Sequence, residues 1–210
     1  MGVVRFKLAG ALVAAAASFT MLFTALFTAV VDADVRATKR DAEVLRQKVA
    51  TINAEAEKPT KQGRQTTVTE TEVNAYLAYD AGKQIPVGVV EPSVSILGTG
   101  RLSGRAVVDL DAVRKQHNPT SLLDPMNYLS GRLPVSATGV LTTNKGMGRF
   151  QLESAYISSI PVPKLLLQEI VSYYSKSAEN PAGINIDDQF ALPAKIREIR
   201  VERGQAIVVQ

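Results

Sequence analysis

Apolar and polar positions follow three different patterns along the chain, and the first is an unbroken apolar run. Residues 8–31 carry no charge over 24 positions. This exceeds the roughly 7–15 residues of a signal-peptide core and the roughly 20 that cross a bilayer as a helix. Arg5 and Lys7 precede the run, so the positive-inside rule keeps the N-terminus in the cytoplasm. We therefore expect residues 1–33 to form a single-pass anchor in the inner (cytoplasmic) membrane, with the C-terminal domain outside the cytoplasm. Cleavage at the small residues that end the run is the alternative, and it would give a secreted or periplasmic protein.

A thin apolar stripe marks the second part, residues 34–57, which are rich in Ala, Glu, Lys and Arg. One interpretation is a solvated single helix that leaves the membrane. The other is a short coiled coil through which residues 34–57 of two copies form a homodimer. Lys58 and Pro59 end the helix, so residues 34–66 are expected to be a charged helical stalk followed by a linker. The residues of the stripe recur about every 3.5 positions: Val35, Ala42, Leu45, Val49 and Ile52.

The third part, residues 67–210, carries the mixed periodicities of a folded α+β domain with an antiparallel sheet. Thr69 followed by Glu72 makes a capping box, which predicts a helix near residues 70–80. Pro163 at a first helical position predicts an amphipathic helix over residues 163–177. The other expected elements are a hairpin over residues 94–110, a short helix near 120–129, a hairpin over 133–157 and a last hairpin over 194–209.

Composition and charge exclude several functional classes. The chain has no cysteine and one histidine, which excludes disulfide scaffolds, Cys-type zinc sites, iron–sulfur centres, thiol nucleophiles and multi-histidine metal sites. The net charge of +4 arises entirely before the domain, because residues 67–210 contain fourteen residues of each sign. A basic nucleic-acid-binding face is therefore not expected.

The polar motifs of the domain do not assemble into a catalytic or metal-binding pattern. Asp109 and Asp111 are two apart on an expected strand, but they alternate with its apolar residues and so belong to its solvent face. His117 lies in a polar loop, and the chain has no Gly-x-Ser-x-Gly motif to supply a nucleophile. We therefore expect no enzymatic activity, no metal and no cofactor.

The helix over residues 163–177 is apolar around much of its circumference. Leu165, Leu166 and Leu167 are followed by Ile170 and Val171, which is more than a single sheet face would cover. One interpretation is a helix buried between a sheet and other elements. The other is a helix that shares an apolar cavity with a sheet and leaves it open to a lipid chain.

Four segments of the domain resemble the bacterial tubular lipid-binding (TULIP-like) proteins of the cell envelope. They are the helix entry at residues 68–77, the strand at 102–110, the Ile160-Pro161-Val162-Pro163 start of the apolar helix, and the closing residues 199–207. The resemblance covers about residues 67–210. It implies a strongly curved antiparallel sheet wrapped around a long amphipathic helix, preceded by a signal or anchor helix. The family has no catalytic motif, so no catalytic residue is carried over.

The resemblance also implies a function, the binding of a membrane lipid or another apolar ligand in envelope lipid transport or homeostasis. Burial of each CH₂ contributes about 0.8 kcal/mol, so an acyl chain needs no specific polar contact. The residues expected to line the groove are Leu166, Ile170, Tyr173 and Tyr174 of the helix and Val108, Leu110, Phe150, Leu152 and Tyr156 of the sheet. The alternative is a non-catalytic scaffold with a solid core, whose surface binds a protein partner in an envelope complex.

Overall fold

The computed structural model describes residues 37–58, 63–82, 84–117, 130–176 and 180–210. The expected anchor at residues 1–33 and the short helix expected near residues 120–129 lie outside these ranges. Within them, no helix combines the length and the apolar character needed to span a bilayer.

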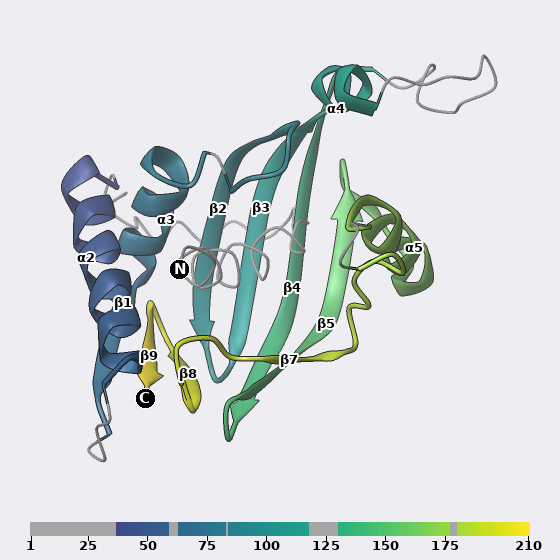
Figure 1. Cartoon of the computed structure of the whole chain (residues 1–210). Coiled ribbons are helices and arrows are strands. Elements are labelled where there is room, and N and C mark those ends of the chain that lie inside the picture. Colours follow the sequence, from purple (N-terminus) through teal and green to yellow (C-terminus); the bar gives the residue numbers. More distant parts are fainter. Residues whose placement is uncertain (1–36, 59–62, 83, 118–129, 177–179) are drawn as a thin grey trace, which may run out of the picture.

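The described residues form an α+β domain whose strands pair antiparallel, as the sequence predicts (Figure 1). The predicted helix near residues 70–80, the hairpins over 94–110, 133–157 and 194–209, and the helix after Pro163 are present, whereas the strands at 65–69, 160–161 and 189–191 and the helix at 110–117 are not predicted by the sequence pattern. The helices are α2 (Lys39–Ala56), α3 (Glu70–Tyr79), α4 (Leu110–His117) and α5 (Lys164–Tyr174). The strands are β1 (Gln65–Thr69), β2 (Val89–Gly98), β3 (Arg101–Asp109), β4 (Arg132–Asn144), β5 (Met147–Ile157), β6 (Ile160–Pro161), β7 (Gln189–Ala191), β8 (Glu198–Glu202) and β9 (Gln205–Val209).

The strands are divided between two sheets. The larger has the order β2-β3-β4-β5-β6, with β7 also pairing with β5, and the smaller has the order β1-β9-β8. Figure 1 shows the small sheet and helices α2 and α3 toward the β2 side of the large sheet, with α5 beside β5. The two ends of the domain meet in the small sheet, where Gln65 pairs with Val209 and Thr69 with Gln205.

Helix α3 starts at the predicted capping box. The Thr69 hydroxyl accepts a hydrogen bond from the Glu72 amide at 3.3 Å, and the Glu72 carboxylate accepts one from the Thr69 amide at 3.0 Å. The sequence analysis does not predict β1, which ends on the capping residue itself. This strand has a single fully buried side chain, Val68, so its own pattern carries little signal.

Polar side chains of α3 bind the outer edge of the large sheet at β2. The Asn74 side-chain amide donates to the Val94 carbonyl at 2.9 Å and accepts from the Val94 amide at 2.7 Å. The Glu70 carboxylate accepts from the Ile96 amide at 2.6 Å. These contacts satisfy backbone groups that an edge strand otherwise leaves free to pair with another chain.

Helix α2 packs on its own domain. Leu45 and Ile52 are buried and join a core cluster with Val68 and Val208. The Lys48 ammonium donates to the Thr67 carbonyl at 2.7 Å and to both Glu72 carboxylate oxygens at 2.6 and 2.8 Å. The stripe that suggested a solvated helix or a coiled coil is therefore used within the chain. Dimerisation through residues 34–57 stays a prediction, since one chain is described.

Phe150 packs over a position of the neighbouring strand that has no side chain. Its ring lies against Gly139 on β4, where a Cβ atom would clash with the ring and with the Gln151 carbonyl. Phe150 belongs to a cluster with Ala137 and Ala155, all of them buried. The absence of a side chain at Gly139 thus leaves room for the aromatic ring beside β4.

We predict that Asn74→Ala destabilises the domain by about 1–3 kcal/mol, because the Val94 amide and carbonyl at the sheet edge lose their partners. Denaturant unfolding of the full chain in detergent, followed by circular dichroism, measures this loss. The matched control is Asn53→Ala on α2, because the Asn53 side chain has no hydrogen bond within the described part of the chain. An equal midpoint for the two variants would contradict the proposed edge contact.

We also predict that Gly139→Ala lowers the free energy of unfolding by about 1–3 kcal/mol, because the added methyl group overpacks the space that Phe150 fills. Gly82→Ala is the control, because a Cβ there meets nothing within 4 Å. The same denaturation measurement compares the two alanine variants. Wild-type stability of Gly139→Ala would show that the ring moves aside at little cost.

Candidate apolar binding cavity

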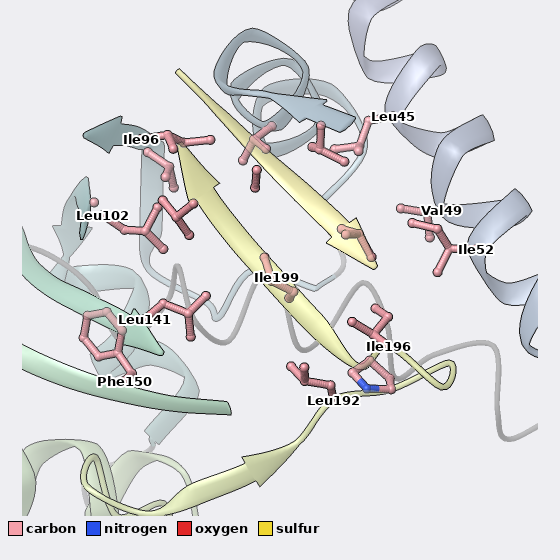
Figure 2. Close-up of a pocket in the computed structure, with 18 of the residues that line it drawn as sticks. Leu45, Val49, Ile52, Ile96, Leu102, Leu141, Phe150, Leu192, Ile196 and Ile199 are labelled. Carbon is pink, nitrogen blue, oxygen red and sulfur yellow. The ribbon is translucent and has the colours of Figure 1, made fainter. Parts of the chain in front are cut away.

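A cavity of about 100 Å³ lies in the apolar layer between the two sheets and α2 (Figure 2). In Figure 2, Leu45, Val49 and Ile52 point toward it from α2, while Leu102 and Phe150 lie on the opposite side. The rest of the lining comes from most of the elements around the cavity: Val73 of α3, Val94 and Ile96 of β2, Ser103 and Gly104 of β3, Leu141 of β4, Val68, Ile199, Val201, Ala206 and Val208 of the small sheet, and Phe190, Leu192, Pro193 and Ile196 of β7 and the segment after it.

The small sheet presents one apolar face to this layer. Ile199 pairs with Val208 and Val201 pairs with Ala206 across the β8–β9 hairpin, and residues that face each other across strands share a face. Val68 of β1 continues the same face, because it pairs with Ala206. Alternation along short strands therefore places these side chains on the cavity side.

The lining is almost free of polar groups. Among the twenty described residues that line the cavity, Ser103 alone has a polar side chain. Its hydroxyl donates to the Ala137 carbonyl at 3.3 Å and accepts from the Thr138 hydroxyl at 3.2 Å, so it is already hydrogen-bonded to β4. Such a lining offers no hydrogen-bond partners to water and therefore suits an apolar guest.

Its size sets a limit on the guest. A dry cavity of about 150 Å³ lined by aliphatic and aromatic side chains binds benzene. The present cavity is about 100 Å³, so in this shape it accommodates a smaller apolar group, such as the end of a hydrocarbon chain. A whole acyl chain requires the lining to move apart.

The residues expected to line a groove lie in different places. Phe150 lines the cavity, and Leu152 packs beside it in the cluster that also contains Val162 and Leu167. Val108 is half-buried on β3, outside the cavity lining. Leu110 begins α4 and is not part of the strand that the alternation suggested.

A β-bulge separates Tyr156 from the apolar face of β5. Thr138 pairs with Ser154 while Gly139 pairs with Leu152, so Glu153 is an extra residue on β5. One added residue reverses the alternation beyond it. Ala155 therefore follows the Leu152 side of the sheet and Tyr156 lies on the other side.

Three of the four α5 residues expected at the groove, Leu166, Ile170 and Tyr173, are not part of the cavity lining. Leu166 and Tyr173 are 49% and 54% exposed, and Ile170 is half-buried. The side chain of Tyr174 lies outside the described part of the structure. It is Leu167 of this helix that packs on the sheet, against the cluster of Ala137 and Phe150.

Apart from Phe150, sequence reasoning missed the residues that line the cavity, and three of the missed residues belong to α2. Leu45, Val49 and Ile52 are in the predicted stripe, but that stripe was assigned to a stalk outside the domain. The available signal was the stripe itself, since a helix with one apolar face needs a surface to cover it. What the spacing leaves undecided is whether that surface belongs to the same chain.

The acidic pair of the 94–110 hairpin has a structural role. The Asp109 carboxylate accepts a hydrogen bond from the Ala112 amide at 3.0 Å, which, together with Arg132 at 3.5 Å, holds the pKa of Asp109 below its usual value. Because the folded-state pKa is lowered, this contribution to stability is present above the ordinary carboxyl pKa and is lost as the pH falls through the lowered value. Asp111 lies within α4, not on the strand as expected, and pairs with Arg114 at 2.9 Å.

Within the described residues, no three His, Asp or Glu side chains gather in a way that could hold a metal ion. The side chain of His117 lies outside the described part. Among the described residues, the cavity is therefore the best-defined candidate binding site, and its lining is apolar.

Comparison with known proteins adds no relative to this description: no family model and no curated protein matches the chain.

Proposed function

We propose that this chain is a membrane-anchored, non-catalytic domain outside the cytoplasm that binds a lipid or another apolar ligand. The observation that carries the proposal is the cavity lining, in which nineteen of the twenty residues, all except Ser103, have no polar side-chain group. Residues 1–33 would hold the domain at the inner membrane, and transport or homeostasis of envelope lipids would be its role.

The energetics favour the end of an acyl chain as the bound group. Each buried CH₂ contributes about 0.8 kcal/mol, so three or four methylenes contribute roughly 3 kcal/mol without any polar contact. That binding is weak by itself, but a nearby bilayer supplies acyl chains at high local concentration. Tight binding of a longer chain would require the lining of α2 and the large sheet to separate.

The proposal refines the arrangement that the resemblance to tubular lipid-binding proteins implies. In that arrangement a curved sheet wraps around a long amphipathic helix. Here the helix that shares the cavity with the large sheet would be α2, through Leu45, Val49 and Ile52, and not the helix over residues 163–177. Access from the bilayer would then lie beside the segment that leaves the membrane.

A second candidate function rests on the size of the cavity. Ligand pockets usually enclose about 300–1,000 Å³, whereas this cavity holds about 100 Å³. A space this small also suits the core of a scaffold protein that binds an envelope partner through its surface. The two functions differ in whether an acyl chain enters the cavity.

Photo-crosslinking separates these functions. The full chain in phosphatidylcholine nanodiscs is irradiated with dodecanoic acid that carries a terminal diazirine, and cross-linked peptides are identified by mass spectrometry. We expect adducts in the peptides that contain Leu45–Ile52, Leu102 or Phe150. Adducts confined to residues 8–31 and to exposed positions would contradict cavity binding and favour the scaffold.

A variant whose side chain fills the cavity tests whether the probe binds there. We predict that Ala206→Leu lowers cross-linking at the cavity about tenfold, equivalent to 1.4 kcal/mol, because the larger side chain occupies the space of the guest. Ala78→Leu adds the same group at an exposed position of α3 and should leave the adducts unchanged. Equal labelling of both variants would mean that the probe binds elsewhere.

A further inference from the structure

Helix α5 exposes large apolar side chains that the cavity does not use. Leu165 is 81% exposed, Tyr173 54% and Leu166 49%. Ile184 is 42% exposed and is held beside the helix, because its carbonyl accepts hydrogen bonds from the Gln168 amide at 3.0 Å and the Ser172 hydroxyl at 3.1 Å. We call Leu165, Leu166, Tyr173 and Ile184 the α5 face.

The helical members of the α5 face lie on one side of the helix. Leu166 and Tyr173 are seven residues apart, which places them on the same side of an α-helix. Leu165 precedes Leu166 and widens that side, while Leu167 points to the sheet and packs on Ala137 and Phe150. A soluble monomer seldom gathers exposed leucine and aromatic side chains this way without a binding role.

The charges around the α5 face are balanced. The Lys176 ammonium lies 5.8 Å from the centre of the Tyr173 ring, and Lys164 pairs with Asp187 at 2.5 Å. Glu169 is exposed on the same side of the helix. An aromatic ring with a lysine beside it suits a bilayer interface, where the ring lies among headgroups and the ammonium reaches water. The balance argues against attraction by an anionic partner.

The length of chain before the domain limits how far the domain can lie from a bilayer. The uncharged run ends at Val31, and α2 begins at Lys39. The seven residues between them span at most about 25 Å when extended. If residues 8–31 cross the membrane, the domain stays within a short distance of the bilayer, and even weak apolar contact becomes effective.

We propose that the α5 face docks on the surface of the bilayer that holds the anchor, with Leu165, Leu166 and Tyr173 inserted at the headgroup level. This inference rests on the membrane attachment in the proposed function but not on a ligand in the cavity. The occupant is the lipid bilayer itself, and the contact is apolar, so it should change little with salt.

The chain contains no tryptophan, so a single introduced tryptophan reports one position. The full chain carrying Leu165→Trp or Tyr173→Trp is reconstituted in phosphatidylcholine vesicles whose acyl chains carry bromine, a quencher of indole fluorescence. Leu97→Trp is the control, at a position 43% exposed near the end of β2. Figure 1 shows that this end of β2 lies away from α5.

We expect the two α5 reporters to lose about half or more of their emission at both low and high salt, because an interfacial helix lies roughly 5–10 Å deep, where headgroups meet acyl chains. The Leu97→Trp emission should stay near its value in unbrominated vesicles. If Leu165→Trp fails to fold, the conservative Tyr173→Trp variant decides the question.

Emission of the α5 reporters equal to that of Leu97→Trp, whether all are quenched or none, would overturn the docking proposal alone. A chain that does not float with the vesicles after alkaline extraction would overturn the membrane attachment and the docking together. Cavity cross-linking can succeed or fail independently of both results, so the three failures are distinguishable.

Discussion

The pairing of β1 with β9 is the interaction on which the rest of the domain depends. It joins Gln65–Thr69 to Gln205–Val209 in five consecutive antiparallel pairs, across almost the whole length of the domain. Because β1 leads directly into α3 and β9 is paired with β8, this one ladder fixes the helix and the hairpin together. The β8–β9 hairpin is also joined to the large sheet, where the Thr143 hydroxyl of β4 donates to the Ile199 carbonyl at 3.0 Å and accepts from the Ile199 amide at 2.7 Å.

The cavity is a consequence of that closure. One wall is the small sheet, which exists only when the two ends of the domain meet. Another wall is α2, which Lys48 ties to the Thr67 carbonyl and to Glu72. Glu72 is 9% exposed and also caps α3, so the ion pair, the cap and the strand end form one connected polar group beside the apolar layer. A buried carboxylate that loses such a partner is costly, which makes this group an effective constraint on where α2 lies.

The domain presents apolar surface in two separate places, and they suit different tasks. The cavity is lined by residues of both sheets and α2 and offers space for a short hydrocarbon group. The α5 face is open and offers side chains to a surface. Figure 1 shows α2 and α5 at opposite sides of the large sheet, so the α5 face lies apart from the cavity wall that α2 forms. Lipid binding and membrane docking are compatible in this arrangement but do not require one another.

Local patterns in the sequence determined the elements that depend on neighbouring residues. The Thr69–Glu72 capping box, the β2–β3 and β4–β5 hairpins and the start of α5 after Pro163 all follow from contacts within a few residues. The antiparallel α+β class follows from their order. Alternation also places Phe150 on the apolar side of its strand, and Phe150 lines the cavity.

Only the tertiary structure decided which apolar surfaces meet. The α2 stripe is visible in the sequence, but a helical period does not specify whether the covering surface is a second copy or the same chain. Strand β1 is too short and too rich in threonine to be recognised without its partner, β9. The extra residue at Glu153 moves Tyr156 to the other face, since one inserted residue reverses a period of two. In each case the deciding contact joins residues far apart in the chain. The period of apolar residues shows which side chains are buried, but it does not show which residues they pack against.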